Sequence, residues 1–348
     1  MSDNGHGAPL PPRAVIFGCA GLEPSAWERS FFAETDPAGF ILFQRNCQDP
    51  DQLRGLVAAL RDSIGRPDAP VLIDQEGGRV ARLRPPHWRL PPAAAVFAGL
   101  YAADPERARQ AAWLSARLIA DDLAALGITV DCVPVLDVPI AGADSVIGDR
   151  AFGEIPDQIA DLGRQVCNGM ITGGVLPVIK HIPGHGRALV DSHTDLPEVD
   201  SPLAELDATD FAPFRELCDM PVAMTAHVVY KAADAEAPVT LSEAAIRTLI
   251  RERIGFQGLL LSDDLSMQAL AGGLDDRARR AIQAGCDIVL HCNGEQEEME
   301  AVAPAVPRLG PEAAGRLQSA LDRIPAPEGQ QGFDAAAALA RLDELLAT

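Results

Sequence analysis

The sequence has few residues of the kinds that mark nucleic-acid-binding or membrane proteins. Of its 348 residues only 29 are lysine or arginine, against 50 aspartate or glutamate, and the net charge is −21. An acidic excess of this size argues against nucleic acid or an anionic membrane as a partner, because both attract basic surfaces. It leaves a small-molecule substrate open, since a cleft can carry its own local charge.

Long apolar runs and paired cysteines are also missing. No run approaches the roughly 20 apolar residues that span a bilayer. No basic segment leads into an apolar one near the N-terminus, so we expect no signal peptide. The seven cysteines are odd in number, scattered and without a C-x-x-C pair, which favours free thiols in a reducing compartment. We therefore expect a cytoplasmic protein that does not contact a membrane. We also expect it to be a monomer.

Eight short apolar runs predict buried strands. They are too apolar for half-exposed antiparallel strands and fit strands that are covered on both faces. The runs are residues 14–18, 39–43, 70–74, 129–137, 176–180, 221–225, 258–262 and 287–290.

Amphipathic segments between these runs predict helices. The clearest is 242–254, with Ser242 as N-cap and Gly255 as the C-terminal stop, and 107–126, 157–172 and 265–284 are similar. Alternating strands and helices predict one (β/α)8 TIM-type barrel with an extra C-terminal helical tail. A doubly wound sheet is the alternative, but no glycine fingerprint follows the first strand. We expect a single catalytic domain over 1–348, with 1–13 as a flexible N-terminal segment.

Polar residues follow most of the predicted strands. Burying charged or imidazole groups is costly unless they bind or react with something. The carboxyl ends of barrel strands open onto one face, where such enzymes keep their active sites. We therefore expect an active site built from the groups at these ends, which are Asp74 to Arg79, Asp137, Lys180-His181, His227, Asp263-Asp264, and His291 with Asn293.

The segment after the fifth strand is the most informative. It reads Lys180-His181-Ile182-Pro183-Gly184-His185-Gly186, and Asp191-Ser192-His193 follows closely. The loop over 183–201 is longer than the 12–15 residues or so beyond which loops are usually functional or disordered. An Asp two residues before a His can pair with it, raise its pKa and make it a general acid. The alternative is a hydrogen bond within the loop that has no chemical role.

Asp263 is the second reactive candidate. A carboxylate at a buried strand end can act as nucleophile, metal ligand or general base. Alternatively, Asp263 or Asp264 caps the following helix, and both roles can hold because there are two residues.

Metal and cofactor motifs are weak. His181 and His185 are four residues apart, a spacing that binds zinc on a helix, but Pro183 and Gly184 lie between them. No G-x-S-x-G elbow, Walker A loop or His-x-His after the first strand is present. We expect no metal and no cofactor. A metal-dependent amidohydrolase and a non-catalytic sugar-binding protein remain as alternatives.

These motifs together resemble those of family 3 glycoside hydrolases, and among them the bacterial single-domain β-N-acetylglucosaminidases (β-N-acetylhexosaminidases) of peptidoglycan recycling. The similarity covers about residues 39–293. Ile182 stands where the family usually has Phe, and Asp149 where Glu is more frequent. The matching segments are Asp74-Gln75-Glu76-Gly77-Gly78-Arg79-Val80, Ile147-Gly148-Asp149-Arg150, Lys180 to Gly186, Asp191-Ser192-His193, Ala226-His227-Val228 and Ser262-Asp263-Asp264-Leu265-Ser266-Met267.

The resemblance implies a role for each matching residue. Asp263 would be the nucleophile, and His193, supported by Asp191, the general acid/base. The hydroxyl groups of the terminal sugar would be held by Asp74, Arg82, Arg150, Lys180 and His181. The implied reaction is retaining hydrolysis of terminal β-linked N-acetylglucosamine from small muropeptide fragments of the GlcNAc-1,6-anhydroMurNAc type.

Two alternatives stay within the same family. An imidazole in place of a second carboxyl group repels an anionic acceptor less, so a glycoside phosphorylase on the same barrel is the closest one. The other is a glycosidase for a different β-linked sugar.

Overall fold

The computed structural model describes residues 10–142, 144–188, 190, 192, 195–325 and 332–347. Parallel strands form a closed barrel in the order β1-β10-β9-β7-β5-β4-β3-β2, as the sequence predicted. These strands are β1 (Arg13–Gly18), β2 (Pro37–Leu42), β3 (Val71–Ile73), β4 (Val130–Asp131), β5 (Leu176–Ile182), β7 (Val222–Thr225), β9 (Leu259–Asp264) and β10 (Ile288–His291). A separate two-stranded sheet pairs β6 (Glu198–Val199) with β8 (Val229–Tyr230).

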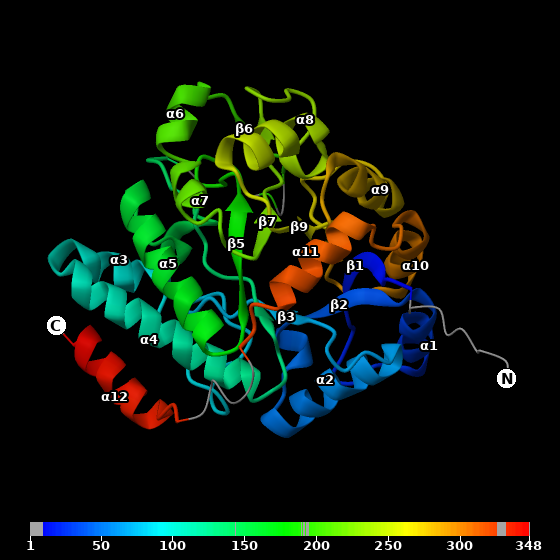
Figure 1. The fold of residues 1–348 in the computed structure, drawn as a ribbon, viewed down its shortest axis with the longest axis horizontal. Coiled ribbons are helices and arrows are strands. Elements are labelled where there is room, and N and C mark those ends of the chain that lie inside the picture. The colour runs from blue at the N-terminus through cyan, green and yellow to red at the C-terminus, as the bar shows by residue number, and fades with distance from the viewer. Residues whose placement is uncertain are drawn as a thin grey trace, which may run out of the picture.

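Helices surround the barrel (Figure 1). Between the strands lie α1 (Ala26–Thr35), α2 (Pro50–Ile64), α3 (Ala94–Ala103), α4 (Pro105–Ala124), α5 (Pro156–Thr172), α6 (Leu203–Ala208), α7 (Ala212–Glu216), α8 (Glu243–Ala245) and α9 (Leu274–Ala284). After β10 come α10 (Gln296–Ala305), α11 (Pro311–Leu321) and α12 (Ala335–Leu346). The short 3-10 turns are η1 (Gln44–Asn46), η2 (Gly148–Arg150) and η3 (Val239–Leu241). None of the helices in the described part of the chain is long and apolar enough to cross a membrane.

Alternation along each strand separates two apolar cores. In β1, Ala14 and Ile16 belong to the cluster inside the barrel, whereas Val15 and Phe17 pack in the cluster between the barrel and the helices. Because every second side chain of a strand points the same way, one strand serves both cores. This double burial explains why the strands are apolar throughout.

The C-terminal helices pack against the barrel and against α4. Leu309 and Ala320 join the cluster inside the barrel, and the Arg316 guanidinium lies 2.8 Å from the carboxylate of Asp287, just before β10. The α11 region therefore covers the amino-terminal end of the barrel. Helix α12 packs against α4 at the side of the barrel (Figure 1). The predicted helical tail is confirmed, and the carboxyl ends of the strands stay uncovered by it.

The fourth strand is shorter than predicted. We expected a strand over 129–137, but β4 ends at Asp131. Pro134 has no N–H group to donate to a neighbouring strand, so the ladder stops. Beyond it, the Leu136 N–H donates to the Lys180 carbonyl at 2.7 Å, and this bond keeps Asp137 beside β5.

Two predicted helices differ in detail. The helix expected over 265–284 begins only at Leu274, because Gly272 and Gly273 precede it and Gly272 has a φ of 91°. The helix over 242–254 is confirmed in extent. Ser242 accepts the Ala245 N–H at 3.1 Å, and Gly255 ends the helix with a φ of 84°. Its main part, Ile246–Ile254, is a π-helix rather than an α-helix.

The proposed flexible segment 1–13 lies mostly outside the described residues, and β1 begins at Arg13. The assignment of the whole chain to one domain stays a prediction.

Candidate active site

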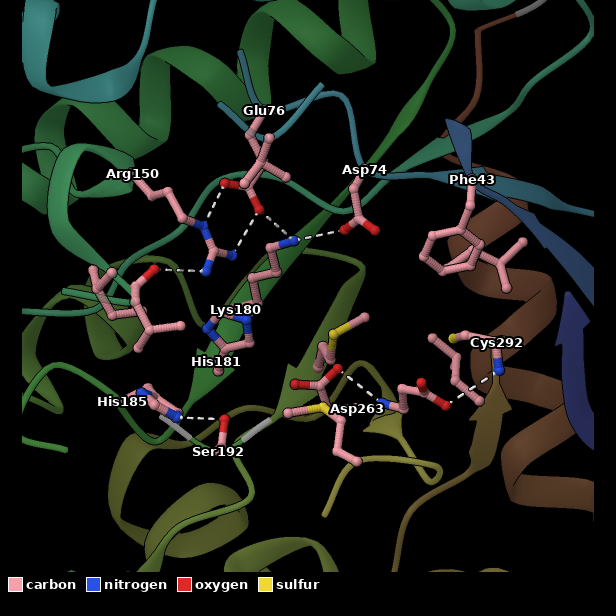
Figure 2. A pocket seen from close by; sticks show the side chains of 18 of the residues that line it. Phe43, Asp74, Glu76, Arg150, Lys180, His181, His185, Ser192, Asp263 and Cys292 are labelled. Carbon is pink, nitrogen blue, oxygen red and sulfur yellow. Dashed lines mark hydrogen bonds and ion pairs between the residues drawn. The ribbon is translucent and has the colours of Figure 1, made fainter. Parts of the chain in front are cut away.

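A cavity of about 330 Å³ opens at the carboxyl ends of the barrel strands. Cavities of this size suit a small ligand such as one sugar ring. Six side chains predicted from the sequence line it, namely Arg82 and, labelled in Figure 2, Asp74, Arg150, Lys180, His181 and Asp263. Asp74 and Arg82 come from the segment after β3, and the others lie in η2, β5 and β9, so the structure brings together groups that are far apart in the sequence.

One wall of the cavity is a chain of ion pairs. The Lys180 ammonium lies 2.8 Å from a carboxylate oxygen of Asp74 and 2.8 Å from one of Glu76. Asp74 also accepts a hydrogen bond from Arg82 at 3.0 Å, and Glu76 accepts two from Arg150, each at 2.8 Å. Charges of opposite sign therefore alternate from Arg82 to Arg150, as Figure 2 shows for the part from Asp74 onward.

These contacts keep both carboxylates ionised. Burial alone would raise the pKa of Glu76, but Lys180 and Arg150 outweigh it and lower the pKa to about 2. For Asp74, burial is outweighed by Lys180 and Arg82, and its pKa falls well below the ordinary value. The two carboxylates in turn raise the pKa of Lys180 against the effect of burial. The wall is thus fully charged at neutral pH.

The backbone around Glu76 turns sharply. Gly77 has a φ of 103°, and a Cβ atom there would lie 2.2 Å from the Pro92 carbonyl oxygen. Only glycine fits this position, which directs the chain away after Glu76 and leaves its side chain in the wall.

Lys180 and His181 are neighbours on β5, yet both side chains line the cavity. The register between β5 and β7 shifts between Lys180 and Ile182, and such an irregularity re-aims a side chain. His181 is fixed from behind by Asp137, whose Oδ2 lies 2.7 Å from the imidazole Nδ1. Burial would raise the pKa of Asp137, but His181 outweighs it and lowers this pKa.

Asp263 and Asp264 are adjacent in the sequence but lie in different surroundings. Asp263 lines the cavity, and its Oδ1 accepts the Asp264 N–H at 2.8 Å. The Asp264 carboxylate accepts from the Ser266 and Cys292 N–H groups at 3.1 and 3.2 Å, so it closes a turn and ties β9 to β10. The expectation of a helix cap is wrong, because the next helix starts only at Leu274.

The remaining strand-end histidines do not reach the cavity. His227 is fully buried, lies 2.7 Å from the Thr240 hydroxyl and donates from Nε2 to the Asp264 carbonyl at 3.0 Å. His291 is also fully buried and packs edge-on against Phe17. Burial lowers the pKa of both imidazoles. The sequence pattern placed them at the correct end of the barrel but could not show that they point away from the cavity.

Asp191 and His193, the predicted acid/base pair, lie outside the described residues. Ser192 between them is described and lines the cavity (Figure 2). Its hydroxyl is 2.9 Å from Nε2 of His185, and its carbonyl accepts the Ala269 N–H at 3.2 Å. Burial lowers the pKa of His185 to about 4, so this imidazole is neutral at pH 7.

Some features at the site were missed from the sequence. Glu76 and Asp137 were noted only as strand-end residues, although each binds two or more groups at the cavity. At the rim, the Asp149 carboxylate lies 2.7 Å from the Arg79 guanidinium, so the residue that departs from the usual Glu still provides an ion pair. Within the described residues, no three His, Cys, Asp or Glu side chains are grouped so that they could hold a metal ion.

Comparison with known proteins agrees with this geometry. The family described as "Glycosyl hydrolase family 3 N terminal domain" matches residues 15–326. The chain belongs to glycosyl hydrolase family 3. It is 41% identical over 307 residues to a protein of Alkalilimnicola ehrlichii named Beta-hexosaminidase, and the alignment covers 87% of each chain. A protein of the same name from Methylococcus capsulatus is 42% identical, over 80% of this chain and 82% of the relative.

Solved structures of the family share the fold. Native NagZ from Neisseria gonorrhoeae superimposes with a TM-score of 0.87 at 35% identity, covering 97% of this chain and 99% of that one. The structure of the same NagZ in complex with N-trifluoroacetyl-D-glucosamine gives the same values. The predicted family, the barrel, and the assignment to glycoside hydrolases of the β-N-acetylhexosaminidase type are confirmed.

Proposed function

We propose that this family 3 enzyme removes terminal β-linked N-acetylglucosamine with retention of anomeric configuration. The observation that carries the proposal is the position of Asp263, which lies in the same cavity as the ion-pair wall of Asp74, Glu76 and Lys180. A hexose held against this wall by its hydroxyl groups has its ring within reach of a carboxylate nucleophile.

Asp263 is ionised and available to attack. Burial would raise its pKa, but His227 and then His181 outweigh this effect and lower it. In the proposed first step, the carboxylate attacks the anomeric carbon while protonated His193 donates its proton to the departing oxygen. The result is a covalent glycosyl-enzyme. In the second step neutral His193 takes a proton from water, the water oxygen attacks the anomeric carbon, and Asp263 leaves as a carboxylate.

The remaining polar groups would bind rather than react. Lys180 and the two arginines, Arg82 and Arg150, offer N–H donors for sugar hydroxyls, and Asp74 offers acceptor oxygens. His181, held by Asp137, presents its other ring nitrogen to the cavity. Asp191 would orient His193 and raise its pKa, so that it carries a proton near neutral pH.

We propose muropeptide fragments of the GlcNAc-1,6-anhydroMurNAc type as the natural substrates, and cell-wall recycling by a cytoplasmic monomer as the setting. The support is the similarity to proteins named Beta-hexosaminidase and to NagZ. Size-exclusion chromatography with light scattering tests the monomer, and digestion of purified muropeptides followed by mass spectrometry tests the substrate.

The central experiment compares an aryl N-acetyl-β-glucosaminide with the corresponding β-glucoside. We expect turnover of the first and little of the second, with the β-anomer of N-acetylglucosamine appearing first in proton NMR. A preference for the glucoside would reject the sugar assignment, and initial release of the α-anomer would reject retention. The same assay with added phosphate separates the phosphorylase alternative, for which N-acetylglucosamine 1-phosphate would be the main product.

A further inference from the structure

Glu76 makes more contacts with the cationic groups of the cavity than any role named so far requires. Its Oε1 is 2.8 Å from Lys180 Nζ and accepts a hydrogen bond from Arg150 Nη2 at 2.8 Å, and its Oε2 accepts one from Arg150 Nε at 2.8 Å. The side chain is only 7% exposed. A carboxylate has about four lone-pair positions; two of them accept from Arg150, and the Lys180 ammonium lies beside Oε1 as an ion-pair partner. Glu76 is therefore better suited to hold other residues than to bind a sugar hydroxyl itself.

Arg150 depends on Glu76 for its orientation. It stands at the end of η2, a turn of three residues, and its other hydrogen bond is a long one, from Nη1 to the Val146 carbonyl at 3.3 Å. Two parallel bonds from Nε and Nη2 to one carboxylate fix the plane of the guanidinium. With that plane fixed, the free N–H groups of Nη1 and Nη2 keep constant directions in the cavity wall.

Lys180 is oriented by the same carboxylate. An ammonium group has three N–H donors in tetrahedral directions. One of them donates to Asp74 at 2.8 Å, Glu76 Oε1 lies 2.8 Å from the same nitrogen as an ion pair, and the lysine side chain is 3% exposed. The attraction of the second carboxylate restricts rotation of the ammonium group and so limits the directions of its other two donors. Without Glu76 the ammonium group could rotate about its bond to Asp74.

We propose that Glu76 is a positioning residue, which aligns the free donors of Arg150 and Lys180 for the hydroxyl groups of the terminal sugar. The inference rests on the proposed function and adds to it a residue that does not touch the substrate. Glu76 converts two flexible cations into a rigid set of donors before the sugar arrives, so less ordering is needed on binding.

The variant Glu76→Gln tests this role. It keeps one acceptor oxygen and the side-chain volume, but it loses the charge and the paired acceptance from Arg150. On an aryl N-acetyl-β-glucosaminide we expect kcat/KM to fall about 10- to 100-fold, which corresponds to one or two charge-assisted hydrogen bonds. Most of the change should be a rise in KM. Asp161→Asn is the matched control, because Asp161 also binds an arginine, Arg109 at 2.7 Å, but outside the cavity.

A double-mutant cycle separates positioning from general destabilisation. We expect Glu76→Gln to cost at least tenfold less in kcat/KM when Arg150 is already methionine, because its main target is then absent. If the loss of kcat/KM in the double variant equals the product of the two single losses within a factor of about two, the inference is overturned. So would a Glu76→Gln enzyme with KM and kcat/KM equal to those of the Asp161→Asn control.

Two further outcomes are informative. If Glu76→Gln does not fold, Glu76→Asp carries the test, because it keeps the charge but withdraws the carboxylate by one methylene from Arg150 and Lys180. A rise in KM of at least tenfold supports the inference, and an unchanged KM overturns it. A wild-type protein without activity on the substrate would reject the proposed function and the inference with it, whereas an active wild type with an unaffected variant rejects the inference alone.

Discussion

Replacing Lys180 by methionine should destabilise the whole fold as well as remove activity. Lys180 is one of only two lysines in the chain. Its side chain is 3% exposed and lies between Asp74 and Glu76, 2.8 Å from each carboxylate. Methionine has a similar length and no charge, so the variant leaves two carboxylates buried close together without the cation between them.

The expected size of the effect follows from this burial. Removing one partner of a buried ion pair typically costs about 3–5 kcal/mol, because the other charge stays in a poorly solvated place. Arg82 and Arg150 still neutralise part of the charge, so we expect the lower half of this range. Equilibrium unfolding in urea, followed by the fluorescence of Trp27, Trp88 and Trp113, measures the change in unfolding free energy.

Lys231→Met is the matched control. Lys231 also pairs with a carboxylate, Glu198 at 2.9 Å, but its side chain is 37% exposed. Water and salt screen such a pair, so this variant should unfold at the wild-type urea concentration. Equal urea midpoints for the two lysine variants would refute the reasoning about the wall.

The pH dependence gives a second readout. In the wild type the lowered pKa of Glu76, about 2 against an ordinary 4.5, stabilises the folded state above pH 4.5. That stabilisation is lost as the pH falls from about 4.5 to about 2. In Lys180→Met the pKa of Glu76 should rise towards its ordinary value, so the loss should be smaller and should end at a higher pH.

Three other predictions concern the reaction and the buried carboxyl group of Asp131. Asp263→Ala should abolish turnover of aryl N-acetyl-β-glucosaminides, and substantial residual activity would remove Asp263 as nucleophile. His193→Ala should reduce kcat/KM far more on natural substrates than on aryl glycosides with good leaving groups, which need little protonation; equal losses on both would argue against general acid catalysis. Asp131→Asn should become more stable relative to the wild type as the pH rises from 4 to 8, because burial raises the pKa of Asp131 to about 8 and the folded protein keeps a proton that the unfolded chain releases. Parallel pH dependences of the two urea midpoints would contradict this last expectation.

The barrel could be predicted because its strands carry a strong local signal. Runs such as 258–262 are apolar on both faces, and the structure uses both faces, one inside the barrel and one under the helices. The carboxyl ends of parallel strands must meet at one rim, so the sequence alone assigns Asp74, Lys180 and Asp263 to one site. Only the topology was needed for this step.

The predictions that failed depended on single residues or on distant contacts. Strand β4 ends at Asp131, six residues before the end of the apolar run, because Pro134 cannot donate a hydrogen bond to the neighbouring strand. The pairing of Glu76 with Arg150 joins residues 74 positions apart, and no local pattern shows which of several carboxylates an arginine will meet.

The directions of His227 and His291 were also missed. His227 follows the end of β7, where strand alternation no longer fixes the direction of a side chain. His291 is the last residue of β10 and alternates with Leu290, so it points out of the barrel towards Phe17.

The cavity gives its carboxylates two different environments. Asp74 and Glu76 are ionised and each is bound by two cationic side chains, so neither is free to react. Asp263 is also ionised, yet among the described residues no ion pair reaches it, and its hydrogen bond comes from the neighbouring Asp264 N–H. Its lowered pKa reflects the imidazoles of His227 and His181, which favour the charged form without a salt bridge that would have to break. A carboxylate kept charged but unpaired is the form that attack on a sugar carbon requires, and this difference in environment separates the nucleophile from the binding wall.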